Sequence, residues 1–316
     1  MPELGYALSS EEHTPLDLVR NARAAEEAGF GFALISDHYH PWVDAQGHSP
    51  FVWSVVGAIA EATDGLVLGT GVTCPTIRIH PAIIAQAAAT SAALMPGRFF
   101  LGVGTGENLN EHILGDHWPA PDERLEMLEE AIEVIRLLWQ GGYQTHRGRY
   151  YTVENARLYT LPDEPLPIAV AAAAPNAAEL AGRVGDAFVS VAPDEELVER
   201  YTSAGGKEVL YGQVTVCWAD SDEEAKKTAR EVWPNAAIEG DLSQELPLPR
   251  HFEQAAEMVS PDDIAKTVVC GPDPERHLAK IREFAEAGFT HVYVHQVGRD
   301  QDGFFRFYRD EILPEL

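Results

Sequence analysis

The sequence predicts an α/β fold of the (β/α)8 TIM-barrel type, formed by a single domain that spans residues 1–316. Strand-like and helix-like stretches alternate along the chain, and repeated strand–helix units imply parallel strands that need covering on both faces. Counting the units gives eight strands, which favours a closed barrel over an open sheet. The length of 316 residues and the hydrophobic content of 45% suit such a barrel.

The first half of the chain supplies four strand–helix units. Thr14 and Pro15 mark a helix start, because a threonine cap and a first-turn proline suit the free end of a helix, and this helix ends near Gly29. The expected strands are 4–8, 31–36, 66–72 and 98–103, and the other expected helices are 51–63, 81–95 and 121–139.

The second half continues the alternation, with two interruptions. The expected strands are 167–172, 187–191, 208–218 and 291–295, and the expected helices are 176–185, 195–204, 222–233 and 274–287. Segment 144–167, rich in Tyr, Arg and Pro, is typical of a hairpin-bearing insertion, and segment 238–261 is typical of a longer excursion over one end of the barrel. Both are expected at the carboxyl-terminal mouth, since loops of this length are usually lids or binding elements.

The composition limits the classes of function. No segment approaches the roughly 18 apolar residues of a membrane span, and the first residues show no secretory signal, so a cytoplasmic location is expected. The three cysteines lack metal or disulfide spacing. Fifty acidic against 23 basic residues give a net charge of −27, which disfavours nucleic acid and anionic membranes as partners.

Barrel enzymes carry their catalytic groups at the carboxyl ends of the strands. The sequence places chemically useful residues directly after five expected strands, namely Glu11-Glu12-His13, Asp37-His38-Tyr39-His40-Pro41-Trp42, Thr73-Cys74-Pro75-Thr76, Gly104-Thr105-Gly106-Glu107-Asn108 and the run Ala171–Ala174.

Asp37 and His38 form the most informative pair. A histidine exchanges a proton near neutral pH, an adjacent carboxylate can bias that proton, and Trp42 can wall a planar ligand. Two alternatives stay open on this motif alone. One is a metal site using His38 and His40, which no helical His or Glu spacing supports. The other is a set of surface polar residues at a strand end.

The glycine-rich run 102–106 fits neither dinucleotide nor P-loop spacing. Its glycines would let backbone approach a ligand, and Glu107 can project a carboxylate into the mouth as a general acid or remain a solvated helix cap. Small residues at 69–75 and 171–174 leave room for a flat ring to lie on backbone, or they reflect tight packing against helices.

Taken together, these motifs resemble the deazaflavin-dependent branch of the bacterial-luciferase-like superfamily, the group of F420-dependent glucose-6-phosphate and secondary-alcohol dehydrogenases. The resemblance covers nearly the whole chain. It rests on Gly5-Tyr6, Ser36-Asp37-His38 with Pro41-Trp42, Thr76 and Arg78 with Pro81-Ala82 and Ala85-Gln86, Pro96 with Arg98, Gly102–Glu107 with Leu109-Asn110-Glu111, and Ala181-Gly182 with Gly185-Asp186.

The resemblance implies a luciferase-like barrel with coenzyme F420 lying across the strand ends. It implies that His38 is the acid/base at the substrate hydroxyl, that Glu107 protonates or stabilises the reduced ring, and that Trp42 and Glu11 shape the site. Gly71-Val72 matches the position at which members of this group carry a non-proline cis peptide that presses on the deazaflavin ring of the coenzyme. The other implied coenzyme contacts are Asp37, Cys74, Thr105, Gly106, Asn110, Ala173, Ala174, Asn176 and Ala177.

One departure concerns the substrate. Sugar-phosphate members of the group bind phosphate with two lysines and an arginine, whereas this chain has Asp194, Ser243-Gln244 and Thr267 at the corresponding positions. A phosphate facing Asp194 would be repelled. Arg250 or His251 could replace the missing charge, and the run Val72–Pro75 is closer to the alcohol-dehydrogenase members.

The expected activity is therefore the transfer of hydride from a secondary alcohol or a sugar, with or without phosphate, to F420, without a metal. Two other functions remain open: an FMN-dependent monooxygenase on the same fold, and a non-catalytic coenzyme-binding barrel. Beyond the coenzyme and a small-molecule substrate, the expected partner is a second copy of the chain, because such barrels commonly form homodimers.

The excess of acidic residues predicts a halophile-like surface that is stabilised by salt, because dense salt screens the mutual repulsion of like charges. We expect the midpoint of thermal unfolding to rise when dilute buffer is replaced by molar KCl. A melting temperature that is unchanged or lower in KCl would contradict this interpretation of the charge.

Overall fold

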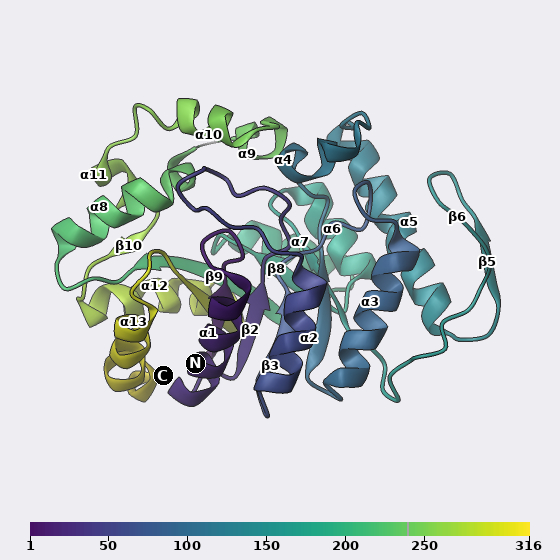
Figure 1. Ribbon diagram of the computed structural model, residues 1–316, viewed down its shortest axis with the longest axis horizontal. Helices are drawn as coiled ribbons and strands as arrows, with labels where there is room; N and C mark the ends of the chain where they lie inside the picture. The colour runs from purple at the N-terminus through teal and green to yellow at the C-terminus, as the bar shows by residue number, and fades with distance from the viewer. Residues whose placement is uncertain (239) are drawn as a thin grey trace.

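The computed structural model describes residues 1–238 and 240–316. It confirms the predicted (β/α)8 barrel. Within these residues, eight parallel strands pair in the order β1-β2-β3-β4-β7-β8-β9-β11, and β11 pairs back to β1. Helices pack around the outside of the strands, and the two termini lie near each other at the amino-terminal end of the barrel (Figure 1).

All eight predicted strands are present, with boundaries shifted by a few residues. The barrel strands are β1 (Glu3–Leu8), β2 (Phe32–Ile35), β3 (Val67–Thr70), β4 (Phe99–Val103), β7 (Ile168–Ala171), β8 (Ala187–Ser190), β9 (Leu210–Cys217) and β11 (His291–Gln296). The remaining strands are β5 (Gln144–Arg147), β6 (Thr152–Ala156) and β10 (Val269–Cys270).

The predicted helices are also confirmed, and several short ones were not expected. The predicted set is α1 (Pro15–Ala28), α2 (Val52–Ala62), α3 (Pro81–Leu94), α5 (Pro121–Trp139), α6 (Pro175–Val184), α7 (Glu195–Ser203), α8 (Asp222–Val232) and α12 (Pro274–Glu286). The unexpected set is α4 (Asn108–Glu111), α9 (Leu242–Glu245), α10 (Pro249–Ala255), α11 (Pro261–Ile264) and α13 (Gln301–Phe307).

Helix α1 shows how local sequence sets an element. The Thr14 hydroxyl accepts a hydrogen bond from the Asp17 amide at 3.2 Å, and Pro15 occupies the first turn, where its missing N–H costs nothing. At the other end Gly29 adopts a left-handed conformation with φ of 103°, which ends the helix. Both ends therefore lie where the sequence predicted them.

The barrel interior is filled by side chains from alternate residues of each strand. Phe100 and Tyr211 stack across it with ring centroids 4.8 Å apart. Gly69 makes room for that layer, since a Cβ there would lie 2.1 Å from Cζ of Phe100. The small residue at 69 thus serves tight packing within the barrel interior, whereas the sequence interpretation had considered packing against helices.

Helix α13 completes the eighth unit and was missed by the sequence pattern. Its Phe304 and Phe305 pack against Tyr6 of β1, with centroid distances of 6.0 and 4.9 Å. The segment is short and contains Gly303, so it lacks a clear helical repeat. This helix is stabilised by packing against the rest of the barrel, and the hydrophobic pattern of its own residues does not record such packing.

The two insertions occupy different places. The predicted hairpin β5–β6 follows α5, runs along that helix and stands away from the barrel body at the right of Figure 1. Its Tyr151 donates a hydrogen bond to the Thr76 carbonyl, and the Glu130 carboxylate of α5 accepts from the Tyr151 amide. No described residue of this insertion lines the central cavity. The expectation that it belongs to the mouth is therefore corrected.

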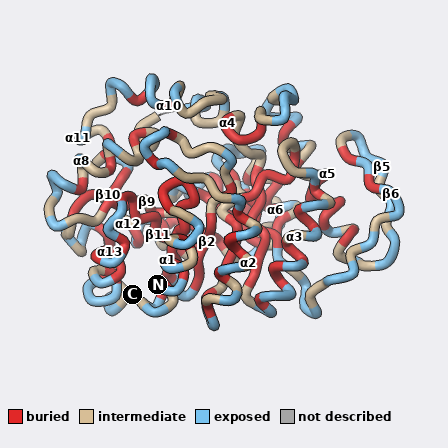
Figure 2. Tube along the Cα trace, viewed as in Figure 1, coloured by how far each residue is buried: buried red, intermediate tan, exposed pale blue. Residues whose placement is uncertain are grey.

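The second insertion does cross the mouth, where α9 and α10 lie above the strand ends in Figure 1. Residue 239, at its start, lies outside the described residues. Burial is concentrated in the strands and the inner faces of the helices, and the β5–β6 hairpin is largely exposed (Figure 2). Among the described residues, no helix has the length and apolar character needed to cross a membrane.

Candidate active site

A single large cavity opens where the carboxyl ends of the barrel strands meet. Its volume is about 1040 Å³. Nearly all of the predicted site residues line this cavity, and they come from the ends of five different strands. Those that line it are Glu11, Asp37, His38, Trp42, Gly71, Val72, Cys74, Thr105, Gly106, Glu107, Ala173, Ala174, Asn176 and Ala177.

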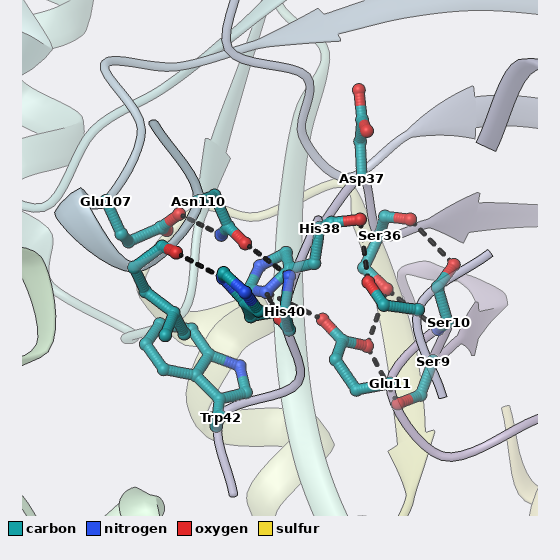
Figure 3. Close-up of polar contacts among 12 residues, drawn as sticks. Ser9, Ser10, Glu11, Ser36, Asp37, His38, His40, Trp42, Glu107 and Asn110 are labelled. Atoms are coloured by element: carbon teal, nitrogen blue, oxygen red, sulfur yellow. Dashed lines mark hydrogen bonds and ion pairs between the residues drawn. The ribbon is translucent and has the colours of Figure 1, made fainter. Parts of the chain in front are cut away.

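His38 is held in place by a buried carboxylate. Its Nδ1 lies 3.3 Å from Oε1 of Glu11, which follows β1, and the side chain of Glu11 is only 2% exposed. The second oxygen, Oε2, accepts hydrogen bonds from the hydroxyls of Ser36 at 2.7 Å and Ser9 at 3.0 Å (Figure 3). Glu11 thus supports the imidazole and is itself fixed by neighbouring strand ends.

This geometry decides which nitrogen of His38 carries the proton. Nδ1 faces the Glu11 carboxylate and also lies 3.3 Å from the His40 carbonyl oxygen, and both of these groups are acceptors. A neutral imidazole with Nδ1 as donor has a lone pair on Nε2. His38 can therefore accept a proton from a ligand in the cavity through Nε2.

The alternative of a metal site using His38 and His40 receives no support from the geometry. His40 turns to the loop after β4, where its Nδ1 lies 2.9 Å from the Leu109 carbonyl oxygen and its ring stacks on His112. The described residues contain no group of three His, Cys, Asp or Glu side chains that could hold a metal ion. Trp42 instead covers His38, with ring centroids 5.1 Å apart.

Asp37 belongs to an ion network that the sequence interpretation missed. Its Oδ1 accepts from Nη2 of Arg78 at 3.0 Å, and its Oδ2 accepts from the Thr73 hydroxyl at 2.8 Å. Arg78 also binds Glu111, through its backbone N–H at 2.8 Å and through Nε at 3.4 Å. Arg78 was part of the motif that carried the resemblance, and its spacing gave no sign of this role.

Glu111 is the most strongly perturbed acid that lines the cavity. Burial raises its pKa to about 7, although the nearby Arg78 lowers it, and the Glu107 carboxylate adds to the rise. Near neutral pH the protonated and ionised forms of Glu111 therefore both occur.

Glu107 and Asn110 form a second connection between loops. The Glu107 Oε2 accepts from Nδ2 of Asn110 at 3.2 Å, and Oδ1 of Asn110 accepts from the backbone N–H groups of Tyr39 and His40. Glu107 is the N-cap residue of α4, as one interpretation of the sequence had it, but its side chain makes no capping hydrogen bond. Asn110 lies behind the cavity wall, and its predicted contact with a coenzyme stays a prediction.

The floor of the cavity is made of small residues. The Gly71–Val72 peptide bond is cis, as the resemblance implied. A Cβ at Gly104 would lie 2.9 Å from Val72 Cγ2, and one at Gly106 would lie 2.6 Å from Cys74 Sγ, so glycine at these positions lets the backbone pack closely against the two neighbouring side chains. Burial raises the pKa of the Cys74 thiol well above its ordinary value. Cys74 is therefore a neutral wall residue.

Two further features of the wall suit anions. Helix α6 begins at the cavity with Ala174 as its cap residue and no side-chain cap, so the first free backbone N–H groups face outward from its start. Arg124, near the start of α5, is the one guanidinium on the described wall and is almost fully buried. Nothing in the sequence pattern singled out Arg124.

Arg124 is bound to the second insertion. The residues of that insertion that line the cavity, here called the lid segment, are 240, 241 and 243–245. Arg124 donates through Nη2 to Oε1 of Gln244 at 2.8 Å, and through Nη1 to Glu245 at 3.3 Å and to the Pro119 carbonyl at 2.8 Å. The lid segment is therefore held over the mouth by a buried cation.

The positions that correspond to a phosphate site carry no cation here. The Asp194 carboxylate caps α7, accepting from the Glu196 and Leu197 amides, and Thr267 bonds the Ile264 carbonyl. Neither side chain lines the cavity. Arg250 and His251, considered as replacements, lie in α10 and do not line it either.

Comparison with known proteins agrees with this architecture. A model of the family described as luciferase-like monooxygenase matches residues 2–291. The chain belongs to this luciferase-like family. The match covers the strand ends after β1 to β9, which carry all the predicted site residues.

Full-length relatives of this luciferase-like protein include F420-dependent glucose-6-phosphate dehydrogenases. The one from Beutenbergia cavernae is 37% identical, covering 100% of this chain and 98% of the relative, and the one from Nakamurella multipartita is 36% identical, covering 99% and 96%. Among solved structures, an F420-dependent secondary alcohol dehydrogenase in complex with an F420–acetone adduct matches with a TM-score of 0.91, 29% identity and 98% coverage of both chains.

A more distant structure shows the fold alone. The coenzyme F420 dependent tetrahydromethanopterin reductase from Methanopyrus kandleri superimposes with a TM-score of 0.80 at 22% identity, covering 99% of both chains.

Glu111 generates a prediction about stability and pH in the luciferase-like protein. Its pKa of about 7 in the folded chain lies above its ordinary value of 4.5. A carboxyl group with a raised pKa stabilises the fold while protonated, and this contribution is lost as the pH rises from about 4.5 to about 7. From pH 5 to pH 8 the loss should be on the order of 2 kcal/mol.

The measurement is urea unfolding of the coenzyme-free protein at pH 5 and pH 8. We expect the free energy of unfolding of the parent to fall over this interval relative to that of the Glu111→Gln variant, which cannot titrate. Parallel pH profiles for the two proteins would show that Glu111 has an ordinary pKa.

Proposed function

We propose that this protein is an F420-dependent dehydrogenase that removes hydride from the carbinol carbon of a secondary alcohol or a sugar. The observation that carries the proposal is the His38–Glu11 pair on the cavity wall, with Nε2 of His38 available as a base. The similarity to F420-dependent dehydrogenases over the whole chain supports the choice of coenzyme.

The residues present fit a flat, anionic coenzyme. The glycines and alanines on the floor place no long side chain in the cavity, so a planar ring can lie against the backbone there. The start of α6 offers free backbone N–H groups, and its positive dipole end favours an anionic tail. Asn176 and Ala177 at this start, with Ala173 and Ala174 before it, are therefore proposed to hold the coenzyme.

When bound, the deazaflavin supplies the carbon atom that accepts hydride. The protein's part is to take the proton. As the substrate C–H bond breaks and its C=O bond forms, Nε2 of His38 accepts the hydroxyl proton, and Glu11 stabilises the resulting imidazolium. Trp42 packs against the imidazole of His38.

Glu107 is proposed to handle the second proton. Its Oε2 is fixed by Asn110, and no hydrogen bond to Oε1 is found among the described residues. Oε1 can therefore hold a proton and deliver it to the ring nitrogen of a bound coenzyme. The charge of Glu107 helps to raise the pKa of the neighbouring Glu111, so Glu111 can also hold a proton on this side of the cavity.

The proposal predicts that the protein bleaches the visible absorbance of F420 under anaerobic conditions when a secondary alcohol or a sugar is present. We expect His38→Ala to lower kcat by about 10²- to 10⁴-fold, the usual contribution of a general base, with the Kd for F420 unchanged. The matched control is His117→Ala, since His117 is exposed and does not line the cavity.

Three outcomes would contradict the proposal. Unchanged turnover in His38→Ala would remove the histidine from the mechanism. Copurified FMN together with consumption of oxygen would identify a monooxygenase. Tight F420 binding without turnover of any alcohol or sugar would identify a non-catalytic barrel.

A further inference from the structure

A second carboxylate–imidazole pair lies beside the first. Glu12, the residue after Glu11, accepts a hydrogen bond through Oε2 from Nε2 of His295 at 2.8 Å, and its Oε1 accepts from the Gly298 amide at 2.9 Å. Both side chains of this pair are 3% exposed. Consecutive glutamates thus each hold a histidine that lines the same cavity.

The second histidine points into the barrel. Side chains alternate along a strand, so His291, Tyr293 and His295 of β11 share one face. That face is the interior one, because Tyr293 packs in the inner core cluster and His291 contacts the ring of Phe32 there. His295 is the uppermost of the three, at the cavity itself.

The free nitrogen of His295 is an acceptor. Burial acts to raise the pKa of Glu12, but the hydrogen bonds from His295 and the Gly298 amide act against it and the pKa is lowered, so Glu12 is ionised. The ionised carboxylate accepts the N–H at Nε2, and in the neutral form of the ring Nδ1 then carries the lone pair. Nδ1 is buried and has no hydrogen-bond partner among the described residues. A buried polar atom without a protein partner is usually paired with a water or a ligand, and the partner of a lone pair must be a donor such as a hydroxyl.

The two histidines are placed to bind one molecule. His38 follows β2 and His295 ends β11, and these strands flank β1 on either side. With strands ~4.8 Å apart, the two lie on strands about 10 Å from each other. Both side chains line the one cavity between these strand ends, so a small molecule with two non-adjacent hydroxyls can contact both histidines.

The charges of the cavity wall disfavour an anionic substrate. Its described residues include seven carboxylates, and one guanidinium that is already bound to the lid segment; the carboxylates are Glu11, Asp37, Glu107, Glu111, Asp122, Asp241 and Glu245. None of the five lysines lines the cavity. A phosphate dianion would meet repulsion from these carboxylates, and the one guanidinium on the described wall, Arg124, already donates through Nη1 and Nη2 to the lid segment, with Nε alone left unpartnered.

We propose that the substrate is an uncharged polyhydroxyl compound, an unphosphorylated sugar or polyol. Its reacting hydroxyl donates to Nε2 of His38, and a second hydroxyl donates to Nδ1 of His295. His295 is then a specificity-determining residue, and Glu12 is a positioning residue that fixes its tautomer. This inference rests on the proposed dehydrogenase function.

The first test uses the parent protein with F420 and two matched pairs of substrates. Glucose and glucose 6-phosphate differ by a phosphate, and 1,4-cyclohexanediol and cyclohexanol differ by a hydroxyl. We expect kcat/KM to be at least about tenfold higher for glucose than for its phosphate, and about ten- to a hundredfold higher for the diol than for cyclohexanol, because an unmatched buried polar group disfavours the poorer ligand.

The outcomes separate this inference from the proposed function. Reduction of F420 by none of these compounds and by no other alcohol or sugar would defeat the dehydrogenase itself. Faster turnover of glucose 6-phosphate than of glucose, or equal turnover of diol and cyclohexanol, would overturn the inference and leave a dehydrogenase.

The second test removes the acceptor. His295→Phe should lower kcat/KM for the diol by about ten- to a hundredfold and leave that for cyclohexanol within about twofold, while His295→Asn, which keeps a donor for Glu12 and an acceptor, should recover part of the loss. The control is His13→Asn, since His13 is buried next to Glu12 and does not line the cavity.

A folding defect can be separated from a binding defect. His295→Phe leaves the Glu12 carboxylate without its partner, so the double variant Glu12→Gln/His295→Phe removes that buried charge as well. Equal losses for diol and cyclohexanol in the double variant would show that the pair is only structural and would overturn the role of His295.

Discussion

Arg78 is the cation on which the mouth of the barrel depends. It stands between two buried carboxylates, Asp37 after β2 and Glu111 after β4, and comes itself from the loop after β3. Each carboxylate would be expensive to bury alone, and removing one partner of such a group typically costs about 3–5 kcal/mol. Three loops that are distant in sequence are therefore held in one arrangement by a single side chain.

The position of His38 follows from that arrangement. Asn110 precedes Glu111, and its Oδ1 accepts hydrogen bonds from the backbone N–H groups of Tyr39 and His40. The loop that carries His38 is therefore fixed from the β4 side. Glu11 fixes the imidazole from the β1 side. The proposed base, His38, thus has a defined tautomer before any ligand binds, and proton transfer by a base depends on such preorganisation.

Charge is distributed unevenly around the cavity. The strand ends and the lid segment supply carboxylates, and the one buried guanidinium on the described wall, Arg124, is committed to holding the lid segment. The start of α6 contributes its positive end without a charged side chain. This distribution of charge supports the proposed binding of an anionic coenzyme at the start of α6 and of an uncharged substrate near the carboxylates.

The sequence by itself determined the barrel and most of its site. Strand and helix periodicity predicted every barrel strand, and strand-end chemistry predicted His38, Glu107 and the glycine floor, because period and capping are local properties. Only the tertiary structure decided that Arg78 joins Asp37 to Glu111, that Arg124 holds the lid segment, that α13 completes the fold, and that Glu12 pairs with His295 across 283 positions. These depend on desolvation and on contacts between segments far apart in the chain, and no local pattern records either.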